Sequence, residues 1–363
     1  MSTKALEELL RKMCALGASD LLLTVGTPPQ FRINGVLQPV GLQPLDAETT
    51  RQMAHSLLNE KQIDQLVLRR SLDLSRGVEG LSRFRINIYF QRDSLALAIR
   101  VIPFVIPPFD QLGLPSIVKD FASSPHGLVL ITGPAGSGKS TTLAAMIDFI
   151  NHTRHVHVVC IEDPIEYLHA HRRSVIDQRE IGEDVRSFGE ALHSVFRQSP
   201  DVIMVGEMRD LETMQLALSL AETGHLILAT LHTQDTTHAI NRIVDGFPAG
   251  QQQQIYTQLS LVLLGIVSQQ LIVTRDATRR VLACEVMIVS NAIRNLIREK
   301  QAQQIYSVVQ TGKSEGMITM NDSLKRLCDD DLIEPDTALQ RSPRPKELAR
   351  MLGMQLIEEG GRV

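Results

Sequence analysis

The sequence has no tryptophan, few aromatic residues and few cysteines. Phe, Trp and Tyr together make up 4% of its 363 residues, which is little for the aromatic-lined channel of a motor that moves along nucleic acid. The cysteines stand far apart and form no C-x-x-C pair, so neither a disulfide framework nor a zinc ribbon is expected. They are Cys14, Cys160, Cys284 and Cys328. Such spacing fits a protein of the reducing cytosol.

Long apolar runs and strong excess charge are also absent. No segment reaches the roughly 18 apolar residues of a membrane span, because the best candidate, 259–273, is interrupted by Ser268, Gln269 and Gln270. The N-terminal segment carries charges of both signs within an apolar pattern, which is not the pattern of a signal peptide. The formal net charge of −4 does not favour a surface that coats nucleic acid. We therefore expect a soluble protein.

The first hundred residues predict a small α+β domain. Residues 1–20 carry leucines and methionine at the three- and four-residue spacing of an amphipathic helix. Strand-like runs follow at 21–25, 30–33, 36–40, 83–90 and 95–102. Asn34-Gly35 favours a hairpin, because both residues tolerate positive φ. Within 83–90, Arg83 and Arg85 alternate with apolar residues, and a turn is expected at 91–94.

A proline-rich stretch separates this part from one with a different pattern. Beyond it, apolar runs alternate with helix-length segments, which indicates a parallel sheet with helices on both faces. The runs are 128–132, 156–161, 202–205 and 226–230. From about residue 288 the pattern is mostly helical. We predict an N-terminal domain at 1–104, a linker at 105–118, an α/β ATPase domain at 119–288 and a C-terminal helical region at 289–363.

A phosphate-binding loop stands between an expected strand and an expected helix. Residues 133–140 match G-x-x-x-x-G-K-[ST] in full. The predicted nucleotide-binding residues are Gly133, Pro134, Ala135, Gly136, Ser137, Gly138, Lys139, Ser140 and Thr141. Glycines let backbone N–H groups cradle phosphate oxygens at a helix N-terminus. Lys139 can then reach the β- and γ-phosphates of ATP, and the Ser140 hydroxyl can ligate Mg²⁺.

Two later strands end in carboxylates. Glu162 follows directly after the run at 156–161, and Glu207 comes after the run at 202–205. Because ligands bind at the carboxyl ends of strands in such sheets, both acids can approach the γ-phosphate and its Mg²⁺. One can orient or deprotonate the attacking water while the other holds the metal through water. Gly206 stands where an ordinary Walker B strand has an aspartate, so Glu207 serves alone or shares the role with Glu162.

Several motifs together resemble one family, the secretion and pilus motor ATPases. Residues 197–210, RQSPDVIMVGEMRD, look like the signature of that family. Residues 161–166 resemble its Asp box, and 223–225 with 230–233 resemble its His box. The resemblance implies a PAS-like N-terminal domain and a RecA-like ATPase domain, with six subunits in a ring. It also implies that ATP lies in the cleft between the two domains.

The resemblance also implies roles for histidines and arginines. His225 and His232 belong to the His box, and we expect them to couple the nucleotide to a neighbouring subunit. The alternative interpretation is that both histidines are structural, with their ring nitrogens engaged in hydrogen bonds. A phosphate-loop ATPase needs cationic stabilisation of its transition state, often from an arginine elsewhere. The candidates for such an arginine, acting in trans, are Arg83, Arg85 and Arg100. The alternative interpretation is that they are merely exposed residues of their strands.

Residues 292–299, AIRNLIRE, match the C-terminal signature of the PilT-like retraction motors. The resemblance implies a homohexamer that retracts a type IV pilus for twitching motility. It implies a cytoplasmic protein docked on the inner-membrane platform protein of the pilus machinery, with a paralogous retraction ATPase as a possible partner and no nucleic acid. The alternatives are a pilus-assembly or type II secretion ATPase and a RecA-like motor on nucleic acid. We expect Ala292, Ile293, Leu296 and Ile297 to pack inward and Arg294 and Arg298 to face solvent.

Overall fold

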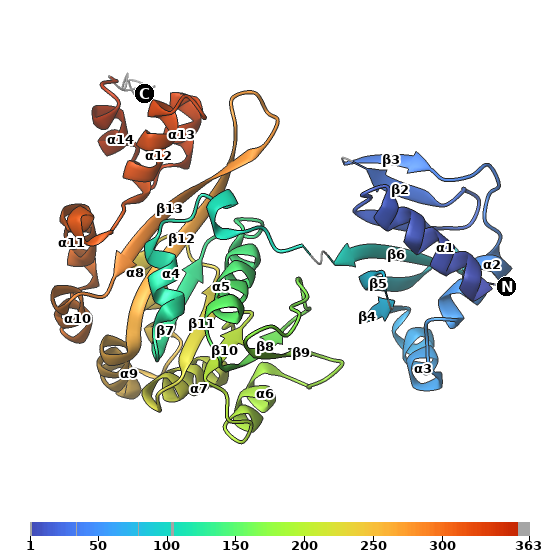
Figure 1. The fold of residues 1–363 in the computed structure, drawn as a ribbon, viewed down its shortest axis with the longest axis horizontal. Coiled ribbons are helices and arrows are strands. Elements are labelled where there is room, and N and C mark those ends of the chain that lie inside the picture. The colour runs from blue at the N-terminus through green and yellow to red at the C-terminus, as the bar shows by residue number, and fades with distance from the viewer. Residues whose placement is uncertain (1, 34, 79, 103–104, 355–363) are drawn as a thin grey trace, which may run out of the picture. The chain divides into compact units, whose positions relative to one another are not determined.

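The computed structural model describes residues 2–33, 35–78, 80–102 and 105–354, and this part of the chain divides into two compact units (Figure 1). Unit 1 comprises Met1–Val105 with Pro164–Leu168, and unit 2 comprises Ile106–Asp163 with His169–Val363. Asn34 of the predicted Asn34-Gly35 hairpin and the end of the predicted C-terminal region lie outside the described residues. The finer division into four regions stays a prediction.

Unit 1 is an antiparallel sheet with helices packed on one face. Its elements are α1 (Ser2–Ala15), β1 (Asp20–Leu23), β2 (Gln30–Ile33), β3 (Val36–Pro39), α2 (Ala47–His55), α3 (Glu60–Arg69), β4 (Ser71–Val78), β5 (Ser82–Gln91) and β6 (Ser94–Ile102). The strands lie in the order β3-β2-β1-β6-β5-β4, and each pairs antiparallel with its neighbours. This confirms the predicted α+β arrangement.

Alternation along β5 determines which face of the sheet is buried. Phe84, Ile86 and Ile88 are buried in one core with the leucines of α1, and the residues between them face the other way, as expected for a strand. The predicted turn at 91–94 is confirmed. Arg92 and Asp93 form it at φ +46° and +59°, the backbone that a two-residue hairpin loop requires.

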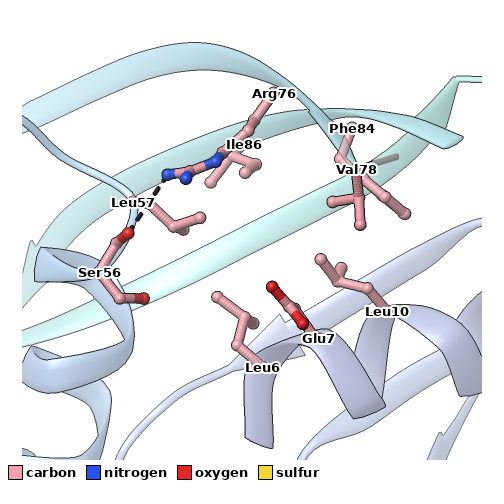
Figure 2. Close-up of a pocket in the computed structure, with 9 residues that line it drawn as sticks. All are labelled: Leu6, Glu7, Leu10, Ser56, Leu57, Arg76, Val78, Phe84 and Ile86. Atoms are coloured by element: carbon pink, nitrogen blue, oxygen red, sulfur yellow. Dashed lines mark hydrogen bonds between the residues drawn. The ribbon is translucent and has the colours of Figure 1, made fainter. Parts of the chain in front are cut away.

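A small pocket lies in unit 1 between α1 and the sheet (Figure 2). Its lining residues are Leu6, Glu7, Leu10, Ser56, Leu57, Arg76, Val78, Phe84 and Ile86. The Arg76 guanidinium crosses its rim and donates from Nη1 to the Ser56 carbonyl oxygen at 3.2 Å. The volume of about 30 Å³ has room for water molecules but not for a nucleotide.

Unit 2 is an α/β sandwich. Its elements are α4 (Ile117–Ser123), β7 (Gly127–Thr132), α5 (Lys139–Thr153), β8 (His157–Glu162), β9 (Val175–Glu180), α6 (Phe188–Val195), β10 (Val202–Val205), α7 (Leu211–Glu222), β11 (Leu226–Leu231), α8 (Thr236–Asp245), α9 (Ala249–Val262), β12 (Leu263–Val273), β13 (Arg280–Ile288), α10 (Asn291–Arg298), α11 (Ile305–Thr311), α12 (Met320–Asp329), α13 (Pro335–Arg341) and α14 (Pro345–Met351). The strands lie in the order β13-β12-β7-β11-β10-β8-β9. They pair parallel except at β12–β13, which is antiparallel.

Helices cover both faces of this sheet, as predicted (Figure 1). Leu128 and Leu130 of β7 pack with α6, α7, α8 and α9, whereas Val129 and Ile131 pack with α4 and α5. Both β7 and β11 are buried along their whole length, which explains their unbroken apolar sequences. The α/β fold class, with a smaller α+β unit before the ATPase sheet, is confirmed.

The segment 259–273 consists of the end of α9 and the strand β12. Its interrupting Ser268 and Gln269 are fully buried in that strand. In the described part of the chain, no helix is long and apolar enough to cross a membrane.

The environment of α10 corrects one expectation. Ser290 accepts a hydrogen bond from the Ile293 N–H and so begins the helix, and Ile293 and Ile297 are buried as expected. Ala292, however, is exposed. Arg294 is half-buried rather than solvent-facing, and its Nε is buried without a hydrogen-bond partner among the described residues. Only Arg298 of the predicted basic pair is exposed.

Candidate nucleotide site

The phosphate-binding loop joins β7 to α5 at the carboxyl edge of the parallel strands. Gly133, Gly136 and Gly138 have φ of +141°, +75° and +91°, angles that side chains other than glycine rarely adopt. Space also requires glycine at the first position. A Cβ on Gly133 would lie 2.4 Å from the carbonyl oxygen of Gln269 and 2.6 Å from Ser137 Oγ. The loop is thus packed tightly against β12.

A buried ammonium group and unused hydroxyls line this loop. Lys139 is 8% exposed, and its Nζ donates to the carbonyl oxygens of Gly133 at 2.9 Å and Pro134 at 3.0 Å. Thr132 Oγ1 and Ser137 Oγ are buried without a hydrogen-bond partner among the described residues. Ser140 is only partly buried in the first turn of α5. Positive charge, unused hydroxyl donors and a helix N-terminus fit the phosphates of a nucleotide.

Glu207 lies after β10, two strands from β7, and is held from both sides. Its Oε2 pairs with Arg209 Nε at 2.7 Å, and its Oε1 pairs with His232 Nε2 at 3.3 Å. His232 follows β11, the strand between β10 and β7. The Glu207 side chain is 19% exposed, against 44% for His232 and 63% for Arg209. The structure therefore brings Glu207 and His232 together, with a fixed carboxylate at the edge where the phosphate loop begins.

Glu162 is one strand further from the phosphate loop. It ends β8, which lies beyond β10 in the sheet, so it is displaced by about one strand spacing, ~4.8 Å, relative to Glu207. Its side chain is buried and accepts a hydrogen bond from Gln178 Nε2 at 3.0 Å. Gly206 fits closely beside β8, because a Cβ there would lie 3.2 Å from the Ile161 carbonyl oxygen. This crowding disfavours the aspartate of an ordinary Walker B strand.

The structure places His225 away from this site. It precedes β11, and its carbonyl oxygen accepts from the Gly127 N–H at the start of β7. The six residues of β11 span about 20 Å, so His225 lies at the opposite edge of the sheet from His232. Its ring Nδ1 contacts the Leu220 carbonyl oxygen at 2.9 Å. His225 and His232 therefore lie at opposite ends of β11, and the expected coupling of His225 to a neighbouring subunit stays a prediction.

The three candidate arginines share one face of the unit 1 sheet. Arg85 and Arg100 are direct cross-strand partners in β5 and β6, and Arg83 stands two residues before Arg85. Arg100 Nε pairs with Asp20 at 2.8 Å. Arg83 Nε donates to Ser75 Oγ at 2.6 Å. The sheet thus collects their positive charge on the face opposite its core.

Sequence reasoning missed a set of buried polar residues on β12 and β13. Gln269 and Thr142 of α5 are joined through their side chains, with Gln269 Nε2 donating to Thr142 Oγ1 at 2.8 Å. Ser268 Oγ donates to the Gln234 carbonyl oxygen at 2.8 Å. Glu285 accepts from the N–H and hydroxyl of Thr236. The available signal was Ser268-Gln269 inside an otherwise apolar run, since buried polar groups are usually placed for a hydrogen bond.

The loop, the sheet order and the acids at the carboxyl ends of β8 and β10 together define a P-loop nucleotide-binding protein. Residues 109–328 match the family model of the type II/IV secretion system proteins. The chain is 43% identical over 339 residues to the type IV pilus retraction ATPase PilT of Pseudomonas aeruginosa, covering 93% of this chain and 98% of that protein. It therefore belongs to the type II/IV secretion system protein family and, within it, to the PilT-like pilus retraction ATPases.

Further comparisons agree over nearly the whole length. A crystal structure of the pilus retraction motor PilT with bound ADP has a TM-score of 0.89 and 47% identity, covering 95% of this chain and 98% of that one. The type IV pilus ATPase PilU of Pseudomonas aeruginosa is 39% identical, covering 95% of this chain and 91% of that protein. These similarities support nucleotide binding and establish the chain as an ATPase of this family.

Proposed function

We propose that this chain hydrolyses ATP to retract a type IV pilus and so drives twitching motility. The observation that carries the proposal is near-complete coverage of a retraction ATPase at 43% identity, in a chain whose phosphate loop and Glu207–His232 pair are both intact. The matches to type II secretion ATPases are shorter, such as 33% identity to HxcR over 62% of this chain. They give weaker support to a function in type II secretion.

Phosphate binding is assigned to the loop between β7 and α5. Lys139 Nζ exchanges its two carbonyl contacts for phosphate oxygens of ATP, and the backbone N–H groups of the loop surround the phosphates. The Ser140 hydroxyl would supply a ligand to Mg²⁺, and Glu207 would support the ion through water. When bound, the metal ion supplies positive charge that offsets the charge of the phosphates.

Glu207 is assigned to the attacking water. Phosphoryl transfer needs little covalent help, so its catalysis depends on position and electrostatics. The contacts with Arg209 and His232 restrict the carboxylate to one orientation, which reduces the conformational freedom lost when water and phosphate are aligned. His232 also connects this carboxylate to the loop after β11. Glu162, more distant and already bonded to Gln178, has a supporting role.

The proposed assembly is a ring of six subunits at the cytoplasmic face of the inner membrane. Arg83, Arg85 and Arg100 are proposed to complete the nucleotide site in trans. The ring would dock on the membrane platform protein of the pilus machinery, and Arg298 is the exposed arginine of the segment 292–299 that we assign to this contact. Similarity to both PilT and PilU supports a paralogous retraction ATPase as a further partner.

Assembly can be tested by mass. With nucleotide and Mg²⁺, the purified chain should form particles of six times 40.3 kDa, about 240 kDa. The physical reason is that the stabilising arginines lie in unit 1 while the phosphate loop lies in unit 2. Mass photometry alongside an ATPase assay measures both properties. Monomers with full turnover would contradict the ring.

Cellular function can be tested by deletion. Cells that lack the gene should carry more surface pili than the parent and should not twitch, because pili that are assembled are no longer withdrawn. Electron microscopy counts the pili, and a stab assay measures motility. The matched control is complementation with the wild-type gene and with Lys139→Ala, of which only the first should restore motility. Loss of surface pili would instead assign the chain to assembly.

A further inference from the structure

Strand β12 touches the phosphate loop through Gln269. This side chain is 0% exposed and forms a double contact with Thr142, its Nε2 donating at 2.8 Å and its Oε1 accepting at 3.2 Å. Thr142 lies in the first turns of α5, directly after the phosphate-binding residues. The Gln269 carbonyl oxygen also packs against Gly133. One residue of a neighbouring strand thus contacts the beginning of the loop and the helix that follows it.

The preceding residue of the same strand touches a second loop. Ser268 is fully buried, and its hydroxyl donates to the Gln234 carbonyl oxygen two residues after His232. Glu285, its direct partner on β13, accepts from the Thr236 N–H at 3.0 Å and from its hydroxyl at 2.7 Å. Burial raises the pKa of the Glu285 carboxyl, while these donors act in the opposite direction. The loop that carries His232 is thus held at two points.

Successive residues of a strand point to opposite faces of its sheet. Val267 packs with α5, as Gln269 does, whereas Ile266 packs on the face that carries α8, as Ser268 does. The two contacts are therefore separate, although the residues are adjacent in sequence. Both residues lie far along the chain from the recognised motifs. The sequence alone therefore did not connect them with ATP.

We propose that Gln269 and Ser268 are positioning residues for ATP hydrolysis, Gln269 for the phosphate loop and Ser268, with Glu285, for the loop that presents His232 to Glu207. The proposal rests on the ATPase activity assigned above. The proposal assigns nucleotide binding to the contact of Gln269 and turnover to the contact of Ser268. Loss of the Gln269 contact weakens nucleotide binding, because Lys139 and the loop N–H groups lose their alignment. Loss of the Ser268 contact slows turnover with little effect on binding.

The first test uses Gln269→Leu, Thr142→Val and the double variant in the purified full-length chain. Affinity for ADP and for a non-hydrolysable ATP analogue is measured by titration, and stability by the melting temperature. Each single variant should weaken binding by about tenfold, since it leaves a buried polar group unpaired. The double variant removes both partners, so its melting temperature should recover. Its affinity should stay about tenfold reduced, because the constraint on the loop is still absent.

The second test uses Ser268→Ala, with Gln270→Leu as the control from the same strand. Gln270 contacts the Arg341 carbonyl oxygen rather than either loop. Ser268→Ala should lower kcat by about fivefold to tenfold, the effect of one misaligned hydrogen bond, and should leave nucleotide affinity within about twofold. Gln270→Leu should change neither kcat nor affinity.

Three outcomes would overturn the proposal. If affinity returns together with stability in the Gln269→Leu, Thr142→Val double variant, the contact is only structural. A wild-type kcat in Ser268→Ala would disprove the positioning role of Ser268 for the loop that carries His232. If Gln270→Leu lowers kcat or affinity as much as the test variants do, the effect belongs to any change in β12 and not to these contacts. Wild-type binding and turnover are measured in parallel, so failure of these predictions is distinguishable from absence of ATPase activity.

Discussion

Lys139→Ala is expected to abolish ATP turnover and to weaken nucleotide binding by on the order of 100-fold or more. The lysine is the buried cation of the phosphate loop, held at 2.9 and 3.0 Å from the carbonyl oxygens of Gly133 and Pro134. Alanine removes the charge that faces the β- and γ-phosphates, and no other described lysine or arginine lies within residues 133–141. Titration with a fluorescent ADP analogue and a steady-state ATPase assay measure the two effects.

The matched control for this prediction is Lys119→Ala. Lys119 belongs to the same unit but is partly exposed in α4, where it pairs with Asp110. Its loss should leave binding and turnover near those of the wild type. Circular dichroism establishes that Lys139→Ala is folded. Retention of wild-type affinity in folded Lys139→Ala protein would disprove the assignment of the phosphate site.

Glu207→Gln should leave nucleotide binding within a few-fold of wild type and slow hydrolysis by on the order of 100-fold or more. Glutamine preserves the shape of the side chain but removes the negative charge that orients or deprotonates the water. Arg209 and His232 hold this carboxylate in place, and a positioned general base contributes roughly 10²-fold to 10⁴-fold to a rate. Single-turnover hydrolysis, measured with a separate binding assay, distinguishes slow chemistry from weak affinity.

Glu162→Gln is the comparison that decides between the two acids. Because Glu162 lies one strand further from β7 and is bonded to Gln178, its replacement should reduce turnover less than Glu207→Gln does. An exposed acid of α7, Glu212, provides a surface control as Glu212→Gln. If Glu207→Gln hydrolyses ATP at the wild-type rate while Glu162→Gln does not, the catalytic role moves to Glu162.

Much of the candidate site was readable from local sequence. The phosphate loop needs particular residues in consecutive positions, so Gly133, Gly138 and Lys139 were recognisable without knowledge of the fold. The buried parallel strands β10 and β11 gave unbroken apolar runs, which placed Glu207 and His232 at strand ends. The turn at 91–94 was also predicted, because the strand before it alternates clearly.

Other features depended on which strands become neighbours. The place of His232 beside Glu207 follows from the pairing of β10 with β11, which neither motif encodes. Residues 259–273 contain no turn residue between α9 and β12, so the change from helix to strand left no local signal. Arg294 was expected in solvent, yet packing around α10 leaves it half-buried.

By itself, the sequence determined the class of chemistry: a phosphate loop, two strand-end acids and a family of motor ATPases. These are consequences of short-range patterns, in which backbone conformation and residue type act within a few positions. Only the tertiary structure decided that β11 lies between β7 and β10, that Arg209 and His232 hold Glu207, and that Gln269 meets Thr142 across 127 positions. The physical reason is that such contacts depend on strand order and packing in space, and the periodicity of a single strand does not encode which strand will lie beside it.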